Sequence, residues 1–114
     1  MQGSEDKIKV SFPASADFTR IGRVALCGLA MRVGVEISKM DELTNITNKA
    51  VEALQGSGSI TLNAYWEQDS IQITFENPDA NIDEESIESI LNMSSESTQN
   101  ITVKQTLVEF SLLK

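Results

Sequence analysis

Few residues in this chain of 114 have side chains that could do chemistry. Histidine is absent, which removes the commonest general base, the commonest zinc ligand and every catalytic triad that relies on an imidazole. The single cysteine, Cys27, excludes an internal disulfide and a cysteine metal cluster. Because Cys27 lies inside the apolar run 24–29, we interpret it as a buried thiol that fills a small core site and not as a nucleophile.

A group of carboxylates is a candidate site for binding a hard cation. It contains Asp79, Asp83, Glu84 and Glu85, and Mg²⁺ and Ca²⁺ prefer such oxygen ligands. Acidic runs more often complement the positive end of a helix dipole, so the sequence favours a helix start over a metal site. The glycine segment 56–58 offers no phosphate-binding loop, because it lacks the lysine and the spacing of a P-loop.

The composition is that of one small globular domain spanning residues 1–114, which is enough chain for a modest core. The net charge of −8 disfavours nucleic acid and anionic lipid as partners, because both require a stripe of lysine and arginine that the sequence lacks. No apolar stretch reaches the roughly 18 residues of a membrane-spanning helix, and no signal peptide is visible. We therefore predict a soluble cytoplasmic protein without a nucleic-acid or membrane partner.

The elements that would position these residues begin with a strand over residues 7–12, in which apolar and polar side chains alternate until Pro13. Ser15 or Asp17 is predicted to cap a first helix, and Gly34 to end it. The apolar face of this helix is predicted to contain Phe18, Ile21, Val24, Ala25, Gly28 and Leu29.

A second helix and a hairpin follow. Ser38, three residues before Asp41, is predicted to cap the helix in a variant of the capping box, and the apolar stripe continues to residue 54. Segments 60–66 and 70–75 both alternate apolar and polar residues over a short connection, which is the pattern of a β-hairpin.

The last third of the chain is predicted to contain a turn at 77–79, a short helix that starts at the acidic residues 83–85, and a loop over 94–100. Residues 101–113 are predicted to form one strand or two. Hairpin-joined strands with helices on one face make an α+β fold, a two-layer sandwich with a mostly antiparallel sheet.

Four segments of the sequence match a known pattern: residues 12–14, residues 21–34, residues 40–43 leading into Ala50, and the hairpin end 73–75. Together with the order of elements, they resemble the histidine-kinase-like ATPase fold. The closer resemblance is to the bacterial anti-sigma-factor serine kinases of the RsbW and SpoIIAB type. It covers residues 7 to about 82 and rests on apolar and small residues, not on a catalytic signature.

The second helix departs from that family. The family carries a glutamate there, which acts on a water or as a base, and four residues later an asparagine that binds the magnesium of the nucleotide. An ungapped alignment puts Lys49 and Ala53 at these positions, and a shift of one residue puts Asn48 and Glu52 there, in reversed order. Neither register supplies the pair, because lysine is no carboxylate and alanine offers no oxygen to a hard cation.

The segment after the hairpin departs as well. The family has Asp-x-Gly-x-Gly there, whose aspartate bonds the adenine amino group and whose glycines let the backbone approach the nucleotide. This chain has Asn77, Asp79 and Asn81 at those positions. Asn77 keeps an acceptor without the charge, and the other two add side chains. No glycine follows Asn81, so the family's glycine-containing lid is predicted to be deleted.

These departures predict a regulatory protein-binding module with a degenerate ATP site and without catalytic residues, cofactor or metal. The resemblance implies an anti-sigma factor or a related partner-switching regulator that occludes a sigma factor or binds an anti-sigma antagonist. The alternative is an active ATP-dependent anti-sigma-factor serine/threonine kinase, which would need ATP, magnesium and a different alignment of the second helix.

Arg20 and Arg23 are the candidate partner-binding residues. They lie three residues apart near the start of the first helix, and the resemblance implies that this helix contacts the partner. The alternative interpretation is a solvated helix face on which Asp17 pairs with Arg20.

Two further features are predicted to be surfaces for protein contact. Tyr65 and Trp66 are adjacent in a strand, so one should lie in the core and the other on the open face of the sheet. The strand over residues 7–12 is predicted to be a sheet edge that can pair with a second copy of the chain. A homodimer formed there would also fit the family resemblance.

Overall fold

The computed structural model describes residues 7–113; residues 1–6 and 114, which the predicted domain also includes, lie outside the described range. Helices and strands follow one another in the predicted order, and residues 101–113 belong to two strands. The elements are β1 (Lys7–Pro13), the 3₁₀ helix η2 (Ala16–Phe18), α1 (Thr19–Arg32), α2 (Ile37–Ala53), β2 (Ser59–Glu67), β3 (Ser70–Glu76), α3 (Glu84–Leu91), β4 (Thr98–Lys104) and β5 (Leu107–Leu113).

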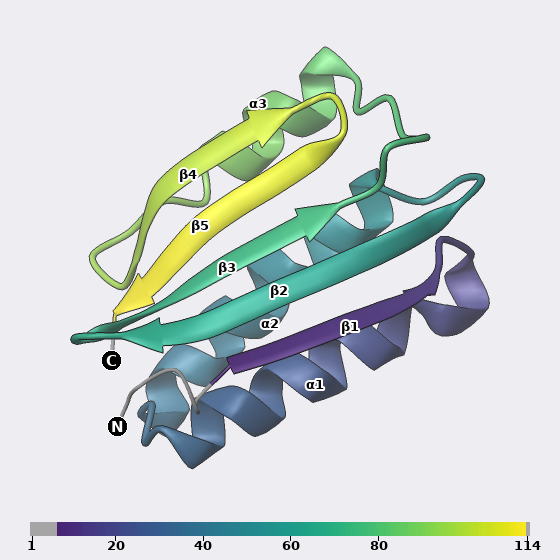
Figure 1. Ribbon diagram of the computed structural model, residues 1–114. Coiled ribbons are helices and arrows are strands. Elements are labelled where there is room, and N and C mark those ends of the chain that lie inside the picture. The colour runs from purple at the N-terminus through teal and green to yellow at the C-terminus, as the bar shows by residue number, and fades with distance from the viewer. Residues whose placement is uncertain (1–6, 114) are drawn as a thin grey trace.

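The five strands form one antiparallel sheet in the order β1-β2-β3-β5-β4. Figure 1 shows α1, α2 and α3 on the same side of this sheet, with α1 beside β1 and α3 beside β4 and β5. The predicted α+β class with an antiparallel sheet and helices on one face is therefore confirmed.

Alternation along the strands gives the sheet a buried face and an open face. The buried face carries Phe12, Ile60, Leu62, Ala64, Ile71, Ile73, Phe75, Val108, Phe110 and Leu112. On the open face, polar side chains bond across the strands: Thr74 Oγ1 donates to Glu109 at 3.2 Å, and Ser111 Oγ donates to Gln72 at 2.7 Å. A single core therefore lies between the sheet and the helices, and the other face is polar.

The buried face of α1 differs from the predicted one. α1 buries Gly22, Leu26, Leu29 and Ala30. Of the predicted face, Phe18, Ile21 and Val24 are instead 41%, 40% and 61% exposed. Leu29 is buried as predicted and Ala25 half-buried. The rest of the predicted face was wrong because two apolar stripes fit the helical period, and only packing in the folded chain selects between them.

The helix starts also differ from the prediction. Ser15 precedes the 3₁₀ helix without a side-chain cap, and α1 begins after Phe18. α2 begins after Glu36, and Ser38 Oγ donates to the Glu36 carboxylate at 3.5 Å instead of capping the backbone. The predicted end of α1 is confirmed, because Gly34 has a φ of +83°, the left-handed conformation that ends helices.

The C-terminal hairpin extends into the segment predicted as a loop. β4 begins at Thr98, which is fully buried, so residues 98–100 are strand and not loop. The pairing of β4 with β5 shifts between Gln99 and Thr102, and Asn100 has a φ of +58°. Within residues 7–113, no helix combines the length and apolar character needed to cross a membrane.

Candidate functional site

The first half of the aligned nucleotide site lies at the end of α2. Asn48, Lys49 and Glu52 are exposed there, and Ala53 is half-buried. The core-facing side of α2 is formed instead by Leu43, Ile46, Thr47, Ala50 and Val51. The α2 positions that the resemblance aligned with the catalytic pair thus lie outside the core-facing side of the helix.

α3 packs beside this end of α2 and leaves shallow cavities between the two helices. One cavity of about 220 Å³ is lined by Lys49, Glu52, Ala53, Glu85, Ser86, Ser89 and Ile90. A second, of about 340 Å³, is lined by Asn45, Asn48, Lys49, Glu52 and Met93. Ligand pockets usually measure roughly 300–1,000 Å³ and enclose most of the ligand, so the first cavity is too small for a nucleotide. Neither cavity reaches Asn77, Asp79 or Asn81.

Asn77, aligned with the adenine-binding aspartate, is fully buried and bonds only to the protein's own chain. Its Nδ2 donates to the carbonyl oxygens of Leu54 and Ser57 at 2.9 and 3.0 Å. Its Oδ1 accepts a hydrogen bond from the backbone N–H of Asp79 at 3.0 Å. The two amide hydrogens thus connect the end of β3 to the end of α2 and the loop after it, and the oxygen accepts within the turn 77–79, so neither amide hydrogen is available to a nucleotide base.

Gly58, before β2, lies close to the segment that follows the hairpin. Gly58 has a φ of +82°, and a Cβ there would lie 3.0 Å from Asn77 Oδ1 and would collide with the carboxylate of Asp79. Asp79 and Asn81 are exposed. The glycine therefore makes room for the side chains of Asp79 and Asn77.

The acidic residues before α3 support the helix. Asp83 is the N-cap residue, and its Oδ1 accepts from the backbone N–H of Ser86 at 2.7 Å. This hydrogen bond lowers the pKa of Asp83. Glu84 and Glu85 occupy the first turn, so the predicted helix start is confirmed. Among residues 7–113, no group of three or more Asp, Glu, Cys or His side chains is arranged to hold a metal ion.

The second candidate site is the solvent-facing side of α1. Arg20 is exposed and Arg23 half-buried, and Val24 and Met31 are 61% and 71% exposed. A shallow depression of about 920 Å³ follows this surface and is lined by Val10, Ala16, Asp17, Thr19, Arg20, Ile21, Arg23, Val24, Ala25 and Asn48. The structure thus brings the two predicted arginines together with apolar side chains that sequence analysis assigned to the core.

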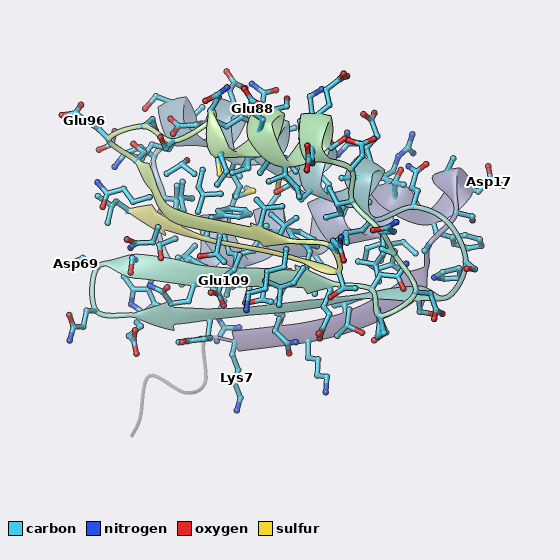
Figure 2. All side chains as sticks on the ribbon, turned by 90° about the horizontal axis from the view of Figure 1, so that it is seen from above. Lys7, Asp17, Asp69, Glu88, Glu96 and Glu109 are labelled. Carbon is cyan, nitrogen blue, oxygen red and sulfur yellow. The ribbon has the colours of Figure 1, made fainter. Side chains whose placement is uncertain are left out.

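Charge is unevenly distributed around this surface. Residues 7–35, which form β1, η2 and α1, contain five basic residues and one acidic residue, a net charge of +4. Residues 36–113 contain three basic and fourteen acidic residues, a net charge of −11. In Figure 2, Lys7 projects from the open side of the sheet and Glu88 from α3 on the helical side. The net charge of the chain conceals a basic edge.

The structure also shows how deeply Cys27, Tyr65 and Trp66 are buried. Cys27 is half-buried, not buried as predicted, and its Sγ lies 4.0 Å from Thr44 Oγ1 between α1 and α2. The prediction for the two aromatic residues is confirmed: Trp66 packs against the core, while Tyr65 is 45% exposed on the open sheet face.

One polar cluster had no signal in the sequence. The carboxylate of Glu42 on α2 accepts hydrogen bonds from the hydroxyls of Ser95 and Thr98, the latter at 2.7 Å. These bonds lower the pKa of Glu42, with a smaller contribution from the charge of Lys39. The partners lie 53 and 56 residues from Glu42 in sequence, so spacing could not have revealed the cluster.

Comparison with known proteins adds no assignment. No protein-family model matches the sequence, and no curated protein matches it.

Proposed function

We propose that this chain is a regulatory protein-binding module of the cytoplasm, built on a histidine-kinase-like scaffold whose nucleotide site is degenerate. In this proposal it acts as an anti-sigma factor or partner-switching regulator does, by holding a partner protein until a competitor takes the same surface. It needs neither ATP nor magnesium to do so.

The observation that carries the proposal is the uncovered apolar face of α1. Ile21, Val24 and Met31 are each at least 40% exposed, and Arg20 lies beside them. Protein interfaces combine such apolar side chains with arginine, because both lose water favourably when a partner covers them. This composition favours a docking surface over a solvated helix face, which would be polar.

The state of the aligned nucleotide site supports the proposal. Asn77 is buried and uses both amide hydrogens for internal hydrogen bonds, and Lys49 and Ala53 lack the oxygen ligands that magnesium requires. Phosphoryl transfer depends on positioning and on metal and charge stabilisation. A chain without these groups is better suited to binding than to catalysis.

Site-specific photo-cross-linking tests the binding function. A photoreactive phenylalanine analogue replaces Val24 on α1, and in a control variant it replaces Asp69 at the tip of the β2–β3 hairpin. In the cells that produce the protein, we expect one discrete cross-linked partner from position 24, none from position 69, and loss of the product when Arg20→Glu and Arg23→Glu are added. Equal cross-linking from both positions, or from neither, contradicts the proposed function.

Isothermal titration with ATP and magnesium tests the degenerate site separately. We expect no saturable heat up to millimolar nucleotide. Saturable binding at micromolar to millimolar strength would overturn the degenerate-site premise and favour the kinase alternative.

A further inference from the structure

The sheet ends one strand short of covering α1. The side of α1 that faces α2 carries Cys27, beside Thr44, and the side that faces the sheet carries Gly22, beside Phe12. At 100° per residue, Ile21 and Ala25 lie on the remaining side, past the free edge of β1. Figure 1 shows α1 continuing beyond β1, with no strand in front of it.

The two edges of the sheet differ in how they resist strand addition. The β4 edge contains a register shift between Gln99 and Thr102 and a left-handed residue, Asn100, which interrupt a regular edge. β1 pairs with β2 over seven consecutive residues without a shift. Within the described residues, β1 has no second neighbour, so it is a regular edge, on which Lys7, Lys9 and Pro13 are the residues that disfavour pairing with an ordinary strand.

We propose that β1 accepts an extended, acidic segment of a partner protein as a sixth strand. This proposal deepens the proposed function and rests on it. Alternate side chains of the segment are apolar and cover Val10, Ile21 and Ala25 in the depression beside α1. The side chains between them are acidic and lie on the open face beside Lys7 and Lys9, as cross-strand pairs of opposite charge do.

Charge complementarity selects this occupant over a second copy. Two copies that meet through the same surface would bring together two regions of net charge +4, which repel each other. A copy that offered its other edge would present β4, whose residues Thr98–Lys104 contain no carboxylate. An acidic strand from a different protein meets neither obstacle.

A synthetic peptide of alternating valine and glutamate is the probe. Titrated into the isotope-labelled protein, it should shift the amide resonances of β1 and α1 and slow hydrogen exchange in β1. A peptide of alternating valine and lysine should bind at least about tenfold more weakly, because it places like charges beside Lys7 and Lys9. Resonance shifts confined to β4, or no saturable shifts, overturn the proposal.

Two N-methylated peptides separate strand addition from docking by side chains alone. One is methylated at every valine nitrogen and the other at every glutamate nitrogen, so both keep all side chains. In a strand, the amides of one set point to the neighbouring strand and those of the other set point away. We therefore expect one peptide to lose about tenfold or more in affinity and the other to bind nearly as before. Equal behaviour of the two contradicts strand addition.

Charge-reversal variants localise the edge. Lys9→Glu should weaken binding of the valine–glutamate peptide about threefold or more, while the matched change at the opposite edge, Lys104→Glu, should leave it unchanged. Equal effects of both variants would show that the peptide responds only to the net charge of the protein and would contradict binding at the β1 edge.

Two outcomes separate this proposal from the proposed function. If cross-linking at position 24 captures a partner but the peptides fail, strand addition is wrong and the binding module stands. If the protein alone sediments as a dimer whose β1 amides are already protected, the occupant is a second copy, and the acidic segment is excluded.

Discussion

Asn77 is a buried residue whose hydrogen bonds connect segments far apart in the sequence. Its position aligns with an aspartate that binds adenine, yet its amide joins β3 to α2 through Leu54 and Ser57. These acceptors lie 23 and 20 residues away in sequence, so the pattern of residues after the hairpin could not predict this role. The sequence shows which residue occupies the aligned position, but it does not show which groups this residue bonds to.

Introducing an aspartate at position 77, as the resemblance would have it, should therefore destabilise the fold and create no nucleotide site. Asn77→Asp replaces two donors by an oxygen that faces the carbonyl oxygens of Leu54 and Ser57. We expect a loss of about 2–4 kcal/mol in the free energy of unfolding, measured by urea denaturation, and no ATP binding. Asn81→Asp, at an exposed position, should change stability by less than about 0.5 kcal/mol. Equal stability of the two variants would show that the buried amide is not needed.

Thr47 is a buried residue with an unsatisfied group. It is 1% exposed, and its hydroxyl has no hydrogen-bond partner. Thr47→Val keeps the branched shape of the side chain and removes the hydroxyl that lacks a hydrogen-bond partner, so we expect a gain of about 1 kcal/mol in the free energy of unfolding. Thr98→Val is the matched comparison, because it removes a hydroxyl that bonds to Glu42, and it should destabilise. The opposite order of the two variants in thermal unfolding would contradict both assignments.

The Glu42 cluster should make stability depend on acid. The hydroxyls of Ser95 and Thr98 hold the pKa of Glu42 below its ordinary value in the folded state. The ionised carboxylate therefore stabilises the fold above the unfolded-state pKa, and this contribution is lost as the pH falls through the lower, folded-state value. The stability advantage of the native protein over Glu42→Gln should shrink below about pH 4. Urea denaturation at pH 7, 5, 4 and 3 measures it.

A second variant tests the cause of that pH dependence. Ser95→Ala removes one of the donors, so the pKa of Glu42 should move back toward its ordinary value and the acid sensitivity should decrease. A stability difference that stays constant from pH 7 to pH 3 would rule out the cluster as its source.

At the scale of the elements, local signals predicted some features and failed for others. The β2–β3 hairpin and the start of α3 could be predicted, because alternation and an acidic first turn are properties of adjacent residues. The buried face of α1 could not, since Ile21 and Leu26 both fit an apolar stripe. The choice between them depends on where the sheet ends, which no local pattern encodes.

The two glycines of α1 should respond in opposite ways to the same substitution. A Cβ at Gly22 would lie 2.9 Å from the ring of Phe12, whereas a Cβ at Gly28 would meet nothing within 4 Å. Phe12 is buried at 2% exposure and cannot easily move. We expect Gly22→Ala to destabilise by about 1–3 kcal/mol through overpacking, and Gly28→Ala to stabilise by about 0.5–1 kcal/mol through helix propensity. Thermal unfolding of both variants checks the sign; two stabilising results would mean that α1 does not press against β1.

For the whole molecule, the order of elements could be predicted, and the charge distribution could not be interpreted until the fold was known. The basic residues of 7–35 come together because β1 is the edge strand and α1 packs beside it. A charged partner far from the molecule therefore experiences the net charge of −8, whereas a partner close to β1 and α1 experiences mainly their positive charge. The net charge and the missing stripe of lysine and arginine disfavour nucleic acid and anionic lipid as partners, but they say nothing about an acidic protein segment.

This contrast predicts an unusual salt dependence for the valine–glutamate peptide. The molecule measures 37 × 26 × 21 Å, and the Debye length is about 30 Å at 0.01 M salt, 8 Å at 0.15 M and 3 Å at 1 M. At the lowest salt the peptide is repelled by the whole molecule, at the middle value it responds mainly to the basic edge, and at the highest both effects are screened. We expect affinity, measured by titration, to pass through a maximum at intermediate salt. A peptide of alternating valine and glutamine should show no maximum, and a monotonic decrease for the acidic peptide would mean that the edge does not act separately from the rest of the molecule.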